Sequence, residues 1–302
     1  MAESQRSVLD SDSTGTYTLV VAVADRGNVE QLMRTAVDLA AANDGEIEVV
    51  SVIHKTPTSP FRLFSDQRIK SEFATGHQEV INRATAAASE ASVPVDGRLL
   101  IGTDVAGAIL TAVEEADADA LFLGWHDKPR ATDVVLGTTV DPVIRRAPCD
   151  VFVERVGTTA DGLESVLFPT VGGPHVEPAT DLAGAVAEAN DAAVTVVSYV
   201  PPGASERDRA PAYEHVEAAA RQLTEVPVET VVEESDDVAG SVVVEAGEHD
   251  LVVLGATRER TLRRRVVGSV AATVSRRADP PVVIAKGRSE GSLLSAVFDR
   301  LR

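Results

Sequence analysis

Two stretches of the chain repeat the same arrangement of glycines, and this repeat constrains the fold more than any other feature. Gly124 is followed, after twelve residues, by Gly137-Thr138, and Gly255 is followed, after the same interval, by Gly268-Ser269. Each copy comes directly after a short apolar run and directly before a segment of helical character. A strand, a glycine turn and a helix start that occur twice indicate two copies of one fold. They also indicate two places where free backbone N–H groups can meet an anion.

The repeat extends over most of the chain. Residues 104–107 recur as residues 237–240, and residues 36–40 recur as residues 179–183. The displacement between the copies falls from 143 residues at the earlier motif to 131 at the glycines, and we expect a longer loop around residues 56–67 to cause most of this change. Two domains of roughly 125–140 residues follow, and each is long enough to bury a core.

Apolar runs alternate with amphipathic segments along both copies, which is typical of a parallel sheet covered by helices on both faces. We therefore predict two doubly wound α/β domains, with one long helix over residues 67–92. The last apolar run of each copy would leave a bare sheet edge, and pairing these two runs with each other makes the chain an internal pseudo-dimer. The expected strands are 18–23, 47–53, 98–101, 120–123 and 151–153 in the first copy, and 165–170, 193–200, 228–233, 250–254 and 282–285 in the second.

The predicted domain boundaries follow from these runs. Residues 17–156 and 163–287 form the two domains, joined by a Gly/Thr/Asp linker over 157–162 and preceded by a disordered polar tail over 1–16. Residues 288–302 have the apolar spacing of an amphipathic helix. Such a helix either docks on its own domain or contacts a partner, for which a membrane transporter is one hypothesis.

The balance of charge excludes some classes of partner. The chain has 47 acidic and 28 basic residues, a net charge of −19, and only four lysines. Such a surface repels nucleic acid and anionic lipid. We interpret it as an adaptation to a salt-rich cytoplasm, where screening weakens the repulsion between like charges. The chain has no apolar run of about 18 residues that would span a bilayer, and we expect a soluble, cytoplasmic protein.

The glycine spacing, the strand order and the final apolar strand together resemble the universal stress protein family. The resemblance covers roughly residues 17–156 and 163–287. It implies a five-stranded parallel sheet in each domain, dimer-like pairing through the last strand and, in some members, ATP or AMP bound at the strand ends. Adenine recognition in that family uses backbone groups, at positions that match Val52 and Tyr199 here.

Neither copy keeps the whole nucleotide signature of the family. The second glycine of the motif is replaced by Asp127 in the first copy and by Arg258 in the second. The acidic residue that nucleotide-binding members place after the first strand aligns with Ala24 and Val171.

Charge distinguishes the two glycine loops. The second loop, residues 256–267, carries five arginines against Glu259 alone, whereas the first has no net attraction for a polyphosphate. We therefore predict that the second domain binds ATP, AMP or another phosphate-bearing ligand, and that a side-chain contact from Arg258 replaces the close backbone approach. The alternative is a solvated arginine surface. The candidate residues are Tyr199, Gly255, Arg258, Gly268 and Ser269, with Val52, Gly124, Gly137 and Thr138 as a weaker set in the first domain.

Catalysis finds little support in the sequence. The six histidines are scattered, without metal-ligand spacing, and no nucleophile-elbow or Walker-type motif is present. The single cysteine, Cys149, is expected to be a buried thiol of no special reactivity. We predict a non-enzymatic regulator with no metal site, and a further homodimer is one hypothesis. The competing hypothesis is a docking module that binds another protein and no ligand.

Overall fold

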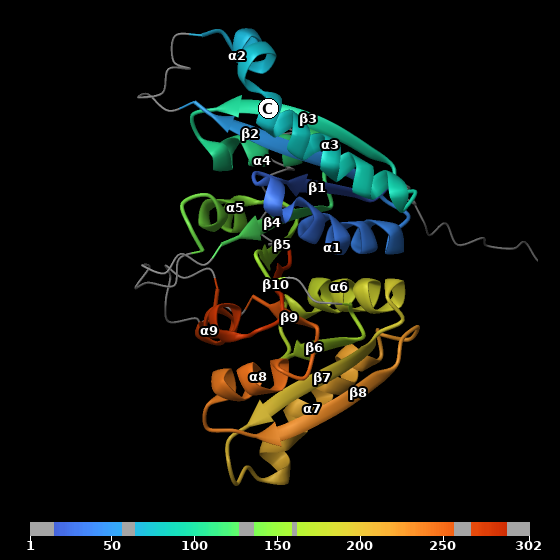
Figure 1. Ribbon diagram of the computed structural model, residues 1–302. Coiled ribbons are helices and arrows are strands. Elements are labelled where there is room, and N and C mark those ends of the chain that lie inside the picture. Colours follow the sequence, from blue (N-terminus) through green and yellow to red (C-terminus); the bar gives the residue numbers. More distant parts are fainter. Residues whose placement is uncertain (1–14, 56–63, 127–135, 159–161, 257–266, 289–302) are drawn as a thin grey trace, which may run out of the picture.

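The computed structural model describes residues 15–55, 64–126, 136–158, 162–256 and 267–288. Strands and helices alternate through both halves, as predicted (Figure 1). The first half contains β1 (Thr18–Ala22), a 3-10 turn (Arg26–Asn28), α1 (Val29–Ala42), β2 (Glu46–His54), α2 (Asp66–Phe73), α3 (Thr75–Glu90), β3 (Val95–Gly102), α4 (Val105–Glu115), β4 (Ala120–Trp125), α5 (Val140–Arg146) and β5 (Asp150–Arg155). The second contains β6 (Ser165–Pro169), α6 (Val176–Ala189), β7 (Ala193–Val200), α7 (Glu206–Ala220), β8 (Val228–Glu234), α8 (Val238–Ala246), β9 (Leu251–Gly255), α9 (Ser269–Arg277) and β10 (Val282–Lys286).

All ten strands of the described residues belong to one sheet, in the order β3-β2-β1-β4-β5-β10-β9-β6-β7-β8. Each half is parallel throughout, and the two halves join where β5 pairs antiparallel with β10, for example Val153 with Ile284. The predicted pairing of the two last strands, and with it the internal pseudo-dimer, is confirmed. In each half the winding direction reverses between the first and fourth strands, so that their carboxyl ends open a crevice where α/β proteins bind ligands.

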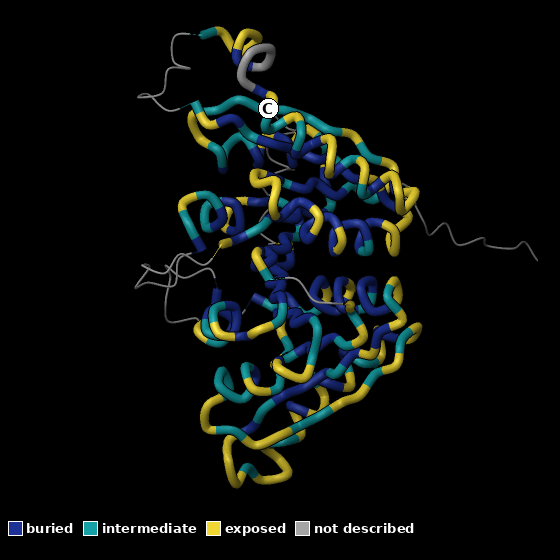
Figure 2. Tube along the Cα trace, viewed as in Figure 1, coloured by how far each residue is buried: buried dark blue, intermediate teal, exposed yellow. Residues whose placement is uncertain are grey.

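Helices cover both faces of this sheet. One face packs against α1, α3, α6 and α7, and the other against α4, α5, α8 and α9. Each of the two apolar cores runs through both halves, because the sheet is continuous. Figure 2 shows the most buried residues along the middle of the sheet and more exposed ones toward its outer strand β8.

A buried arginine reinforces the junction between the halves. Arg155, at the end of β5, is only 7% exposed. Its guanidinium donates to the backbone carbonyls of Ser275 (3.1 Å), Asp279 (3.1 Å) and Pro280 (2.7 Å), all from the second half. The end of α9 is therefore fixed by a side chain from the first half.

The prediction of one long helix over residues 67–92 is wrong. The chain forms α2 and α3 instead, separated at Ala74, where φ is −84° and ψ is −7°. A change of direction at this point lets Ile69 and Ala74 pack against Ile53 in a small separate core over the end of β2. Gly76, which follows the break, also has a low propensity for helix interiors.

The alignment of residues 36–40 with residues 179–183 is also wrong. Leu19 of β1 pairs with Ile47, and Val166 of β6 pairs with Val194, so the first two strands of the halves are displaced by 147 residues and not by 143. The difference of four residues is about one helical turn, which leaves the same face of the helix buried. The extra residues of the first half lie between β2 and β3, as expected, and they include α2.

Some predicted segments lie outside the described residues. These are the polar tail, apart from its last residues, and the amphipathic helix beyond Arg288. Among the helices that are described, none combines the length and the apolar character needed to cross a membrane.

Candidate functional site

A cavity of about 490 Å³ lies at the carboxyl ends of β1, β2 and β4, on the side of α4 and α5. We call it the first-domain cavity. Its walls are largely apolar and include Val50, Val52, Ile109 and Leu123. It is large enough for a nucleotide-sized ligand, since such pockets usually measure about 300–1,000 Å³.

All four candidate residues of the first domain line this cavity, although they are far apart in the sequence. Val52 comes from the end of β2, Gly124 from β4, and Gly137 and Thr138 from the turn before α5. The topology brings them together because the ends of β2 and β4 flank the end of β1.

The second domain has a counterpart at the same place in its fold, which we call the second-domain cavity. It is lined by Tyr199, Gly255, Gly268 and Ser269, four of the five residues predicted there. The fifth, Arg258, lies outside the described residues together with most of the arginine loop. The described walls enclose only about 120 Å³, which is less than ligands of this size require.

One side chain contributes to the difference in volume. Counting from Ile47 in β2 and Val194 in β7, Val52 and Tyr199 occupy the same position in their strands. The second-domain cavity therefore has a phenol ring where the first has an isopropyl group. Burial raises the pKa of Tyr199 to about 12, with Glu245 and Glu233 as further causes, so this phenol is neutral near pH 7.

The glycines of the two copies serve different purposes from those expected. Gly124 and Gly255 lie within strands and do not turn the chain out of them. A Cβ atom on Gly124 would come within 2.9 Å of Val156 and 3.2 Å of Leu32, and one on Gly255 would lie 3.2 Å from the carbonyl oxygen of His175. These two positions favour glycine because neighbouring groups pack closely against the strand.

Only one of the two later glycines has an unusual backbone conformation. Gly137 has φ of +125°, whereas Gly268 has φ of −63° and caps α9 in an extended conformation. The helix expected to start near Thr138 begins at Val140, and Thr138 is exposed. A side chain at position 137 would be strained, so the turn before α5 depends on glycine.

A second cavity, of about 570 Å³, lies next to the first but on the side of α1 and α3. Both cavities are lined by Gly124 and His126, at the ridge formed by the strand ends. The amide nitrogen of Asn28 donates to Nε2 of His126 (2.9 Å), and Nδ1 of His77 lies 2.9 Å from the hydroxyl of Ser51. Burial lowers the pKa of His77, which favours its neutral form. Both rings therefore already have hydrogen-bonding partners within the protein.

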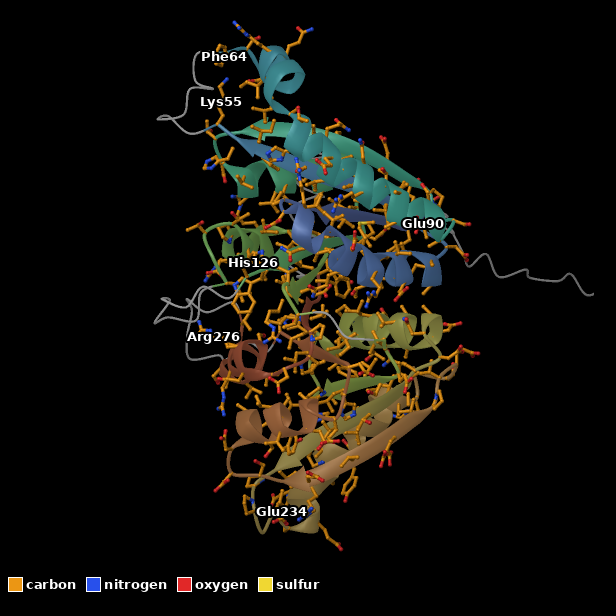
Figure 3. All side chains as sticks on the ribbon, viewed as in Figure 1. Lys55, Phe64, Glu90, His126, Glu234 and Arg276 are labelled. Atoms are coloured by element: carbon orange, nitrogen blue, oxygen red, sulfur yellow. The ribbon has the colours of Figure 1, made fainter. Side chains whose placement is uncertain are left out.

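The sequence did not single out Arg276 as a site residue. It belongs to α9 of the second domain, yet it lines the first-domain cavity together with His126 (Figure 3). Nothing in the local sequence signals this, because it depends on how the two halves pair through β5 and β10.

Cys149 behaves as predicted. It is 1% exposed, and burial raises the pKa of its thiol to about 12, so the nucleophilic thiolate is suppressed at neutral pH. Within the described part of the chain, no group of three or more His, Cys, Asp or Glu side chains has the arrangement of a metal site.

Comparison with known proteins agrees with this architecture. The sequence profile of the Universal stress protein family matches residues 17–155 and 162–286. The chain belongs to the universal stress protein family. It contains two copies of the family's domain in tandem, as the internal repeat predicted.

Among solved structures, a universal stress protein from Archaeoglobus fulgidus superposes with a TM-score of 0.61 at 16% identity, covering 90% of this chain and 97% of that one. The cytoplasmic domain of a prokaryotic cation chloride cotransporter superposes with a TM-score of 0.54 at 10% identity, covering 93% of this chain and all (100%) of that one. At these identities the likeness concerns the fold alone.

A curated relative of this tandem universal stress protein is larger. The Na(+)/H(+) antiporter NhaS5 of Synechocystis is 27% identical over 264 residues, which are 85% of this chain but 36% of the antiporter. The chain thus spans about a third of the length of that relative.

Proposed function

We propose that this tandem universal stress protein is a non-enzymatic regulator that binds an adenine nucleotide, AMP or ATP, in the first-domain cavity. The observation that carries the proposal is the cavity itself, about 490 Å³ in volume and walled by aliphatic side chains at the reversal of winding. An adenine ring would lie between Val50, Val52 and Ile109, and the backbone at Val52 would form hydrogen bonds with the edge of the ring. The ribose and phosphate would extend toward Gly137 and Thr138 at the polar end of the cavity.

The arginine loop supports a second nucleotide site, in the second domain. In this hypothesis Arg258 contacts the phosphates, while Tyr199, Gly255, Gly268 and Ser269 hold the rest of the ligand. It requires the tyrosine ring to move or to stack on the base, because the described second-domain cavity is small.

Exchanging Val52 and Tyr199 tests both sites with matched variants. In the V52Y variant the tyrosine ring should occupy the place proposed for the adenine ring, and we expect AMP affinity to fall at least tenfold, measured by isothermal titration calorimetry on nucleotide-free protein. The reverse variant, Y199V, should keep the first site and can add a second one. Thermal unfolding of each variant serves as the control for folding.

The hypotheses of a first-domain site and of a second-domain site predict opposite effects of these variants on AMP binding. If V52Y binds AMP as the wild type does, and Arg258→Ala removes binding, the ligand occupies the second domain and the first-domain proposal is wrong. If neither the wild type nor Y199V binds AMP or ATP, the nucleotide proposal fails for both domains.

The antiporter relative favours a second candidate function, that of a module that docks on a membrane transporter. The match covers 85% of this chain, so it concerns the tandem pair and not one domain. We propose that the pair binds the cytoplasmic part of a cation transporter, with or without nucleotide. Co-purification with the membrane part of the NhaS5 antiporter, in the presence and absence of AMP, tests this idea; a chain that remains uncomplexed under both conditions contradicts it.

A further inference from the structure

We infer that Arg276, from the second domain, contacts the anionic group of the ligand that binds in the first-domain cavity, so that both domains build this site. The inference rests on the function proposed above and goes beyond it, because it assigns a residue across the domain junction. It is based on the placement and charge of Arg276 and on the contacts that hold the end of α9.

The first-domain cavity contains one unusual charge. Among its described lining residues, Arg276 is the only one with a permanent charge, and most of the others are aliphatic or glycine. A guanidinium remains protonated at all physiological pH values and recognises phosphate and carboxylate with two parallel hydrogen bonds. A ligand for this cavity should therefore combine an apolar part with an anionic group, as a nucleotide does.

The first domain itself holds the end of α9 in place. Arg155 donates to the carbonyl oxygen of Ser275, the residue immediately before Arg276, and to those of Asp279 and Pro280 just beyond the helix. These bonds restrict the backbone on both sides of Arg276. An arginine on a fixed backbone loses less conformational freedom when it binds an anion.

Arg276 also makes an interaction within the protein. This does not prevent contact with a ligand, because a guanidinium has five N–H donors in a planar fork. Its position in the last turn of α9 agrees with the preference of cations for the carboxyl ends of helices.

Among the described residues, the opposite contact, from the first domain to the second-domain cavity, is not formed. The equivalent residue of the first domain is Arg145, in the last turn of α5, and it is exposed. The described lining of the second-domain cavity contains no charged side chain. The pseudo-symmetry of the fold is therefore broken at this point, in favour of the first-domain cavity. A ligand bound there would contact both domains, and its anionic group would bind to Arg276 of the second domain.

The test compares AMP with adenosine, which lacks the phosphate. Isothermal titration calorimetry on the full chain would use the wild type, Arg276→Gln, and the matched control Arg145→Gln. We expect R276Q to weaken AMP binding about tenfold to a hundredfold, the usual effect of losing a hydrogen-bonded charge pair. Adenosine binding should change less than about twofold, and R145Q should bind both ligands as the wild type does.

The outcomes separate this inference from the function on which it rests. If the wild type binds AMP, V52Y does not, and R276Q binds AMP as well as R145Q does, then the first-domain site is real and the role of Arg276 is wrong. If R276Q weakens AMP and adenosine equally, Arg276 only packs against the cavity, and the inference is again overturned. If the wild type binds neither ligand, the proposed function and the inference both fail. An R276Q protein with an unchanged melting temperature excludes misfolding as the cause of an AMP-specific loss.

Discussion

At the scale of single residues, Glu154 is the clearest case of a side chain in an unfavourable environment. It is 1% exposed in β5, the amide nitrogen of Gln31 donates to its Oε1 (2.7 Å), and burial raises its pKa from 4.5 to about 7. Because the folded state holds this proton more tightly, the stability of the fold decreases as the pH rises from about 4.5 to about 7. Replacement by glutamine removes this cost. We expect E154Q to unfold at higher urea concentration than the wild type at pH 8, by on the order of 1–3 kcal/mol, and to resemble it near pH 5.

An exposed glutamate provides the control for this experiment. Glu90 lies at the solvent-facing end of α3, and E90Q changes the net charge by the same amount without changing a buried site. A constant difference between E154Q and the wild type from pH 5 to pH 8 would show that the proton on Glu154 has no part in the stability of the fold.

The candidate site was only partly predictable from single residues. The sequence identified Val52, Gly124, Gly137 and Thr138 because a motif and a family resemblance pointed to them, and the structure brings them to one cavity. It could also have predicted that Tyr199 reduces the volume of the other cavity, since the exchange from valine is visible in the repeat. It could not predict Arg276, because its position depends on how two halves of the chain pair.

At the scale of elements, hydrophobic patterning predicted the strands well and the helices less well. Continuous apolar runs such as residues 251–254 identify strands that are buried on both faces, which have few alternatives. The break between α2 and α3 has no such signal, because it depends on the packing of Ile69 and Ala74 over the end of β2. Contacts between elements, more than local propensity, decide where a helix ends.

The packing of α3 on β3 gives a prediction at this scale. A Cβ atom on Gly97 would lie 2.3 Å from Cγ2 of Ile81, a buried residue on α3. Because Ile81 is held in the core, Gly97→Ala should push the helix away from the strand and destabilise the protein by about 1–3 kcal/mol. Urea unfolding monitored by circular dichroism measures this change.

Gly102 in the same strand is the matched control. Its nearest contact with an added Cβ would be 3.4 Å, an ordinary van der Waals distance. G102A should therefore lose much less stability than G97A. Equal losses would mean that alanine acts through the conformation of the backbone in β3 and not through the contact with α3.

At the scale of the whole molecule, the single ten-stranded sheet makes the two repeats one structural unit. The sequence predicted the pairing of β5 with β10, because exposed apolar edges require a partner. The outer strand β8 leaves one edge of the described sheet unpaired, and its exposed residues include Glu229, Glu233 and Glu234. Such charges oppose pairing with a further sheet. That the acidic surface is an adaptation to a salt-rich cytoplasm remains a prediction.

The junction itself depends on Arg155, and its loss should affect the molecule as a whole. In Arg155→Met the carbonyls of Ser275, Asp279 and Pro280 lose their donor inside a largely buried junction. We expect a loss of about 2–4 kcal/mol, because unsatisfied groups would remain between the two halves. Differential scanning calorimetry should show one transition for the wild type, since both apolar cores run through the two domains, and a lower, broader or divided transition for R155M. The exposed Arg146→Met is the control for the loss of a positive charge. Wild-type domains that already melt separately would contradict the view that the sheet couples them, and with it the structural basis for a ligand site shared across the junction.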